Sequence, residues 1–224
     1  MSDPCADVLR VLGHELRRPL TVIRQAHLEL LIDDADALPP GSRQQMLSMI
    51  DRSSAEMSDL IDDVLMAVHL DIGDVQFSLE SVDVPGLVEE AVETIRLEEP
   101  ARRVEIGPTA GLSVEADREH ALRALRALVQ NADRHSPAGD AVTVTASAED
   151  DVVRVLVLDR GPGIPAAQRE RAFERFTRLD PNASGAGLGL FLARGLARGM
   201  GGEVSLADRE DGGTAACFTL RRRV

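Results

Sequence analysis

The sequence predicts an α+β protein in which a two-helix hairpin precedes a two-layer α/β sandwich. Apolar residues of the first 70 positions recur at alternating steps of three and four, which is the spacing of a helical-bundle seam. After residue 74 the pattern changes to short alternating strands separated by helical stretches, which indicates a sheet covered by helices. The segment Leu70-Asp71-Ile72-Gly73-Asp74 separates the two patterns, so we expect domains at 1–73 and 74–224.

The hairpin is predicted from two long seams joined by a helix-breaking connector. The first helix is expected over residues 3–32, and the connector at 33–41 is rich in acids, prolines and glycine. The second helix is expected over residues 42–70. The seam positions are Leu9, Leu12, Leu16, Pro19, Ile23, Ala26 and Leu30 in the first helix and Met46, Ile50, Ser53, Met57, Leu60, Val64 and Ala67 in the second.

Leu47, Ile61 and Val68 broaden the second apolar stripe, and two such wide stripes cannot be buried in a lone hairpin. A second copy of the chain would complete a four-helix bundle, so we expect a homodimer. The alternative is a hairpin that packs on its own downstream domain.

The second domain is expected to mix strands and helices around a loop-rich stretch at 159–186. Asp117 is the expected N-cap of a helix that runs to about His135. The expected strands are 75–82, 103–106, 112–115, 142–148, 152–158, 203–207 and 214–220, and the expected helices are 84–98, 118–135 and 188–199.

Composition narrows the class of protein. The chain has 224 residues, 44% of them hydrophobic, and a net charge of −13, which argues against nucleic acid or an anionic membrane surface as the main partner. No apolar run approaches the roughly 20 residues that span a bilayer, and no signal peptide opens the sequence. The two cysteines, Cys5 and Cys217, form no metal or disulfide framework, so we expect a cytoplasmic protein without a membrane segment.

A histidine beside a carboxylate is the first candidate site. His14 lies between two seam positions of the first helix, so we expect it to point into solvent. A neutral imidazole can act as a nucleophile through Nε2, and Glu15 can accept the Nδ1 proton and hold the useful tautomer. Taken alone, the pair also fits an ordinary surface histidine.

The end of one helix and the end of one strand offer groups that suit a nucleotide. The amide oxygen of Asn131 is a suitable Mg²⁺ ligand. Arg134 and His135 could contact phosphate, although basic residues at a helix C-terminus also fit a simple interaction with the helix dipole. Asp159 follows an apolar strand, where its carboxylate could accept a hydrogen bond from an amine such as that of adenine, or else belong to a plain turn.

Glycines and aromatic residues complete this set. Gly161 and Gly163 would let the backbone pass close to a flat ring. The segment Gly185-Ala186-Gly187-Leu188-Gly189 opens a helix, where free N–H groups can face a phosphate, and its spacing departs from that of a dinucleotide-binding Rossmann loop. Phe173 and Phe176 lie between these segments on an expected lid over residues 163–186.

In this order, the stretches resemble the catalytic core of a bacterial two-component sensor histidine kinase. His14-Glu15-Leu16-Arg17-Arg18-Pro19-Leu20 is similar to the phosphoacceptor motif H-E-L-R-T-P-L of that family. The other similar motifs are the asparagine box at 131–137, the first glycine box at 159–163, the phenylalanine box with Phe173 and Phe176, the second glycine box at 185–190, and the turn Gly212-Gly213-Thr214 before the last strand.

The resemblance implies a dimerisation and histidine-phosphotransfer hairpin followed by an ATP-binding domain of the Bergerat (GHKL) type. It implies that ATP and Mg²⁺ are the cofactors and that His14, with Glu15, takes the γ-phosphoryl group and passes it to an aspartate of a response regulator receiver domain. Asn131 would bind the metal and Asp159 would recognise adenine. The implied cofactor-binding residues are Asn131, Arg134, His135, Asp159, Gly161, Gly163, Phe173, Phe176, Gly185, Gly187, Leu188, Gly189 and Thr214.

Three departures from the family pattern have consequences. Arg18 stands where the family usually has Thr or Asn, a residue associated with dephosphorylation of the regulator, so we expect weak phosphatase activity. Ala127 replaces the first asparagine of the usual pair, which would weaken Mg²⁺ binding. The lid lacks lysine, which leaves Arg175 and Arg178 as candidate contacts of the γ-phosphate.

Two other classes remain open at this point. The chain could be a histidine phosphotransfer protein with an inactive ATP-binding domain, an alternative that Ala127 keeps open although the intact residues Asp159, Gly161, Gly163, Gly187 and Gly189 argue against it. It could also be an ATPase clamp of the gyrase–Hsp90 type, against which the hairpin around His14 argues. No sensor precedes Leu9, so we expect either an excised core or a kinase that receives its signal from a separate sensor protein.

Overall fold

The computed structural model describes residues 4–32, 41–98, 103–109, 111–137, 139–180 and 185–223, and for residues 4–11, 14, 31 and 32 it describes the backbone alone. The chain divides into two compact units. Unit 1 comprises Met1–Met66 and Asp180–Ala186, and unit 2 comprises Ala67–Leu179 and Gly187–Val224. Nearly all of the predicted connector at 33–41 lies outside the described residues.

The two long helices predicted from the seams are present as α1 (Pro4–Ile32) and α2 (Ser42–Ile72). Every seam position with a described side chain is buried or half-buried, and the side chain of Leu9 lies outside the described residues. By contrast, Leu47 and Ile61, which broaden the second stripe, each remain 48% exposed. A single copy of the hairpin therefore buries its seams but leaves the broader stripe uncovered.

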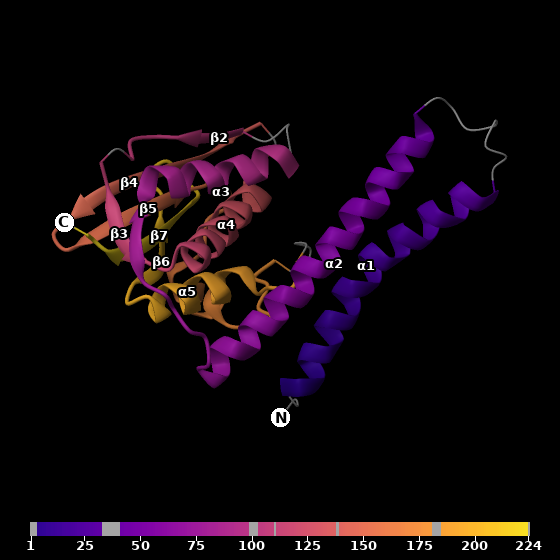
Figure 1. The fold of residues 1–224 in the computed structure, drawn as a ribbon, viewed down its shortest axis with the longest axis horizontal. Coiled ribbons are helices and arrows are strands. Elements are labelled where there is room, and N and C mark those ends of the chain that lie inside the picture. Colours follow the sequence, from indigo (N-terminus) through magenta and orange to yellow (C-terminus); the bar gives the residue numbers. More distant parts are fainter. Residues whose placement is uncertain are drawn as a thin grey trace. The chain divides into compact units, whose positions relative to one another are not determined.

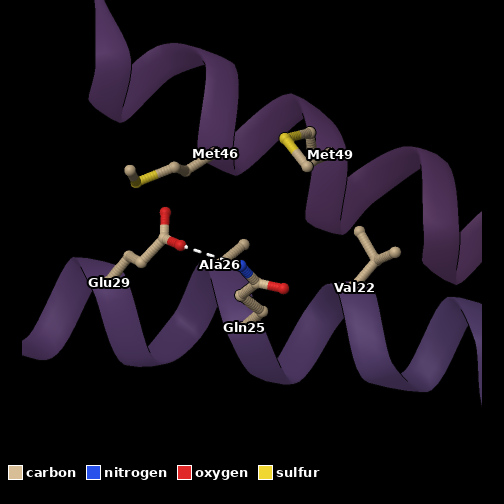
Figure 2. A pocket seen from close by; sticks show the side chains of 6 residues that line it. All are labelled: Val22, Gln25, Ala26, Glu29, Met46 and Met49. Carbon is tan, nitrogen blue, oxygen red and sulfur yellow. Dashed lines mark hydrogen bonds between the residues drawn. The ribbon is translucent and has the colours of Figure 1, made fainter.

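A pocket between α1 and α2 has a volume of about 110 Å³ (Figure 2). Gln25 Nε2 donates a hydrogen bond to Glu29 Oε1 at 3.2 Å along one wall of it. The residues that line the pocket are Val22, Gln25, Ala26, Glu29, Met46 and Met49. Protein interiors are normally close-packed, so the two helices are not fully packed against each other along this stretch.

Unit 2 contains a five-stranded sheet with the strand order β2-β4-β5-β7-β6, in which only β2 and β4 are parallel. Helices α3, α4 and α5 lie on one face of it (Figure 1). The strands are β2 (Arg103–Ile106), β4 (Ala141–Glu149), β5 (Val152–Leu158), β6 (Glu203–Asp208) and β7 (Thr214–Arg221), and the helices are α3 (Val84–Glu98), α4 (Arg118–His135) and α5 (Gly189–Gly199). This is the two-layer sandwich that the sequence predicts.

Side-chain alternation along the central strands explains the two layers. Val155 on β5 pairs with Phe218 on β7, and both side chains are buried. Their neighbours in sequence are only half-buried or exposed on the opposite face of the sheet. Asp117 caps α4 as predicted, since its Oδ1 accepts the N–H of His120 at 3.1 Å.

One predicted strand is shorter than expected. The sequence predicts a strand at 75–82, whereas β1 covers Glu80–Asp83 and pairs with β3 (Ser113–Ala116) in a separate two-stranded sheet. The preceding residues have other partners: the ring centroids of Phe77 and His120 lie 5.0 Å apart, and Ser78 N–H donates to Asp117 Oδ2 at 2.9 Å. The alternating apolar pattern therefore reflects a linker that lies against helices.

Within the described ranges, no helix combines the length and apolar composition that crossing a bilayer requires.

Candidate nucleotide-binding and phosphotransfer site

Asp159 follows β5 directly, and the antiparallel pairing of β5 with β7 brings it beside Thr214. Asp159 is only 5% exposed, and its Oδ1 accepts two backbone N–H groups, from Gly161 at 2.8 Å and from Thr214 at 2.9 Å. The backbone N–H of Asp159 donates in return to the carbonyl oxygen of Thr214 at 3.0 Å. Both bonds to the side chain use Oδ1, so Oδ2 is the oxygen that can accept a hydrogen bond from a ligand.

Glycines allow the backbone to close around Asp159. Gly213 has a φ of +99°, and a Cβ there would overlap with the carbonyl oxygen of Asp159. A Cβ at Gly161 would lie 2.7 Å from the carbonyl oxygen of His135. A Cβ at Gly163, where φ is +76°, would lie 3.4 Å from the carbonyl oxygen of Gly213. The segment 159–163, which we call the Asp159 turn, thus lies between the end of α4 and the turn that joins β6 to β7.

Two further residues hold the Asp159 turn, and sequence reasoning assigned neither of them a role. Arg209, from the turn between β6 and β7, donates through its guanidinium to the carbonyl oxygen of Asp159 at 3.1 Å. Ser136, at the C-cap of α4, accepts the backbone N–H of Arg160 at 3.4 Å through its hydroxyl. Arg209 and Asp159 are 50 residues apart, and a contact between distant segments leaves no local pattern in the sequence. The role of Arg209 therefore could not be predicted from the sequence.

The second glycine-rich segment is packed as closely as the first. Gly187 has a φ of +70°, and a Cβ there would lie 2.6 Å from the carbonyl oxygen of Thr177 and 2.9 Å from the carbonyl carbon of Phe176. Phe176 itself has a φ of +57°, which is unusual for a residue with a side chain. Gly189 begins α5 against Ala127 of α4, with 3.9 Å between its ideal Cβ position and the Ala127 Cβ.

One face of α4 connects the two glycine-rich regions. Ala127, Asn131 and His135 are spaced by four residues, so they lie on the same side of the helix in successive turns. Ala127 contacts the start of α5, and the carbonyl of His135 contacts the Asp159 turn. Asn131 therefore lies between the two regions, and its side chain is half-buried. Arg134 is exposed beside it.

The first part of the lid is anchored through Arg194 of α5, a residue that sequence reasoning did not single out. The Arg194 guanidinium lies over the ring of Phe173, 4.4 Å from its centroid, and binds Glu170 at 2.7 Å and Glu203 at 2.8 Å. Burial alone would lower the pKa of Arg194, but the hydrogen bonds from these two carboxylates outweigh it and raise that pKa. In Glu203 the bonds to Arg198 and Arg194 outweigh burial and lower the pKa.

The predicted phosphoacceptor pair belongs to unit 1. The backbone of His14 lies within α1, but its side chain lies outside the described residues, so its orientation toward solvent stays a prediction. Glu15 is half-buried, and Arg18 is exposed one turn after His14.

Two family descriptions match this chain. The His Kinase A (phospho-acceptor) domain matches residues 6–73, and the histidine kinase-, DNA gyrase B- and HSP90-like ATPase matches residues 116–224. The chain belongs to the histidine kinases. The two matches occur in the order that the motifs predict, with the phosphoacceptor helix first and the GHKL ATPase domain second.

Curated histidine kinases align with almost the whole chain. The sensor histidine kinase WalK of Bacillus subtilis is 30% identical over 220 residues, which cover 93% of this chain and 35% of WalK. The sensor protein CreC of Escherichia coli is 33% identical over 216 residues, which cover 94% of this chain and 44% of CreC. The chain thus spans less than half the length of these relatives.

Solved structures of histidine kinases are also similar. Full-length ShkA in complex with AMPPNP has a TM-score of 0.69 and 29% identity, with 96% of this chain and 46% of that chain covered. The mycobacterial sensor histidine kinase MprB has a TM-score of 0.59 and 28% identity, with 65% of this chain and 99% of that chain covered.

Within the histidine kinase core, the structure brings some of the sequence-predicted residues together and separates others. Asp159, Gly161, Gly163 and Thr214 come together at the end of α4, and Gly187, Gly189 and Phe176 come together beside its middle. Phe173 and Leu188, at 7% and 2% exposure, contribute their side chains mainly to the core. Gly185 has a φ of +102° and belongs, like His14, to unit 1.

Proposed function

We propose that this chain is an ATP-dependent protein histidine kinase, which autophosphorylates His14 and transfers the phosphoryl group to an aspartate of a response regulator. The observation that carries the proposal is the face of α4. It places the amide of Asn131 between the Asp159 turn and the glycine segment that begins α5. The proposed sites for the adenine base (Asp159), for the metal (Asn131) and for the phosphates (the start of α5) thus follow one another along one surface.

Each group has a distinct task in this proposal. Asp159 Oδ2 accepts a hydrogen bond from the amine of adenine, since its Oδ1 is already used by Gly161 and Thr214. Gly187 and Gly189 present backbone N–H groups to the phosphates at the start of α5, where the helix dipole favours negative charge. Arg134 and His135 lie at the other end of the same surface as further candidate contacts.

Asn131 is the proposed protein ligand of Mg²⁺. A side-chain amide oxygen is a hard ligand, and Mg²⁺ commonly completes its octahedral shell with substrate phosphates and water. Across the described part of the chain, no three side chains of the His, Cys, Asp or Glu type are grouped as a metal cage. We therefore propose that Mg²⁺ is held jointly by Asn131 and the bound nucleotide.

The proposed chemistry is an in-line displacement at phosphorus. Nε2 of His14 forms a bond to the γ-phosphorus while the bond from that phosphorus to the bridging oxygen of ADP breaks, and ADP leaves. Glu15 accepts the Nδ1–H and stabilises the charge that develops on the ring. A receiver-domain aspartate then attacks the phosphohistidine and restores the neutral ring.

The proposed assembly is a homodimer of chains divided into domains at 1–73 and 74–224. Exposed apolar residues of unit 1 support it: Leu20, Leu47, Ile61 and Leu65 are each about half exposed in one copy, at 54%, 48%, 48% and 52%. A second copy would cover these side chains and fill the space between α1 and α2. The proposed partners are a response regulator and a separate sensor protein, and the proposed location is the cytoplasm.

Incubation with γ-labelled ATP and Mg²⁺ tests the proposal. We expect acid-labile, alkali-stable label on the wild type and no label on His14→Ala. Asn131→Ala should lose most of its label, because the metal loses its protein ligand. His27→Ala removes an exposed histidine of the same helix and should label like the wild type. Labelling of His14→Ala would refute the assigned acceptor.

The alternative of a phosphotransfer protein with an inactive ATP-binding domain has no support from the comparisons. It predicts that the wild type takes up no label from ATP but accepts a phosphoryl group from a phosphorylated receiver domain.

A further inference from the structure

The last turn of α2 is attached to the ATP-binding unit by small-residue contacts on α5. The segment Ala67–Leu179, which includes this turn, belongs to unit 2. A Cβ at Gly195 would lie 2.8 Å from Leu70 Cδ1, and a Cβ at Gly199 would overlap with the ring of Phe77. Gly195 and Gly199 are one turn apart, so α5 presents a groove without side chains to the end of α2 and the linker.

An ion pair joins this turn to the lid. Arg175 Nη1 binds Asp71 Oδ2, and the Arg175 guanidinium lies 5.8 Å from the centroid of the Phe191 ring at the start of α5. The side chains of Arg175 and Asp71 are 48% and 35% exposed. Ion pairs this exposed are weak, because water competes for both partners. A stronger anion close by can therefore replace Asp71.

The backbone next to Arg175 lies close to the proposed phosphate-binding glycine. Arg175 directly precedes Phe176, whose carbonyl carbon lies against Gly187, the glycine assigned above to the phosphates. Guanidinium binds phosphate as readily as carboxylate, with two parallel hydrogen bonds in either case. The same guanidinium cannot serve both anions at full strength.

We propose that Asp71 is a positioning residue that competes with the γ-phosphate of ATP for Arg175. This inference rests on the proposed binding of ATP to unit 2. ATP binding withdraws Arg175 from Asp71 and so weakens the attachment of the last turn of α2, whereas ADP, which lacks the γ-phosphate, leaves the pair intact. By linkage, anything that releases this turn of α2 favours ATP over ADP by the same factor.

Calorimetric titration of the full chain with Mg²⁺ and either ADP or the β,γ-imido analogue of ATP tests this. We expect Asp71→Asn to lower the Kd of the ATP analogue by about two- to fivefold, which is the range that an exposed ion pair supports, and to leave the Kd of ADP unchanged. Asp71→Glu should restore the wild-type Kd. In an Arg175→Ala background the Asp71→Asn change should have no effect, because the contested cation is gone.

Asp74→Asn is the matched control, because Asp74 is a half-exposed carboxylate three residues after Asp71 that binds His69 at 2.7 Å. Its Kd values should equal those of the wild type. An equal change for ADP and the ATP analogue in Asp71→Asn would mean that Asp71 only supports the fold, and this would overturn the proposal. The proposal would also be overturned if the wild type binds the ATP analogue and Asp71→Asn binds it with equal or lower affinity. A wild type that binds neither nucleotide would overturn the proposed function itself.

Discussion

Oδ1 of Asp159 accepts the N–H of Thr214 at 2.9 Å, although 55 residues separate the two positions in the chain. The same oxygen accepts the N–H of Gly161, so one carboxylate oxygen holds the end of β5, the following turn and the start of β7 together. The structural task thus falls to Oδ1 and the proposed recognition of adenine to Oδ2.

This division predicts different results for two substitutions of Asp159. Asp159→Asn can keep an oxygen at the Oδ1 position but places an NH₂ donor opposite the adenine amine, so we expect ATP affinity to fall by about ten- to a hundredfold with little loss of stability. Asp159→Ala removes both oxygens and should also lower the melting temperature. Calorimetry and thermal unfolding measure the two effects. Unchanged ATP affinity in Asp159→Asn would exclude Asp159 from adenine recognition.

Two adjacent glycines provide a matched pair for the close approach to Asp159. Gly212 and Gly213 both have positive φ, at +85° and +99°, but only at Gly213 would a Cβ meet other atoms. Gly212→Ala should cost about 1 kcal/mol, the ordinary penalty of left-handed backbone. Gly213→Ala should cost about 3 kcal/mol or more, because the Asp159 carbonyl must move as well. Urea unfolding gives both values, and equal costs would contradict the close contact.

The arginines of α5 offer a second comparison. Arg194 is 15% exposed and links Glu170, Glu203 and the Phe173 ring, whereas Arg198 is 56% exposed and contacts Glu203. Arg194→Ala removes the contacts to Glu170 and to the Phe173 ring and leaves Glu203 with Arg198 alone, so we expect a loss of about 2 kcal/mol in the free energy of unfolding. Arg198→Ala should lose only about 0.5 kcal/mol. Similar losses in the two variants would show that Arg194 does not anchor the lid.

Asp117 predicts a pH dependence of stability. Burial raises the pKa of this carboxyl, but hydrogen bonds from His120 and Ser78 outweigh burial and lower it below its ordinary 3.8. A folded-state pKa below the unfolded one means that the charge contributes stability above pH 3.8, which is lost as the pH falls through the folded-state value. Asn also caps helices well, so Asp117→Asn isolates the charge. We expect the variant to be less stable than the wild type near neutral pH, and the difference to disappear as the pH falls through the folded-state pKa of Asp117. A difference that persists in acid would exclude the charge as its cause.

The sequence predicts the fold well where a pattern is local. Apolar periodicity identifies both hairpin helices, and the apolar run at 152–158 gives the bounds of β5 and places Asp159 at its end. Pairing between distant segments leaves no such pattern, which is why Arg209 and its bond to the Asp159 carbonyl are missed. In the sequence, Asp71 is one of several acidic residues near the end of the second helix, and only the structure shows that it pairs with Arg175. Val75 and Phe77 alternate like a strand, because contact with helices also requires alternate side chains to face inward.

Arg18 leads to the last prediction, which concerns dephosphorylation of the response regulator. It lies exposed on α1 one turn after His14, at the position where the family usually has a small polar residue that is thought to orient water. A guanidinium is bulky, positively charged and has no acceptor for a water proton, so the chain should remove phosphate from a regulator slowly. We expect Arg18→Thr to raise the rate of regulator dephosphorylation by about tenfold or more and to leave autophosphorylation of His14 in place. The adjacent Arg17→Thr, which keeps Arg18, is the control and should not change the rate. Fast dephosphorylation by the wild type would show that water is oriented by another residue.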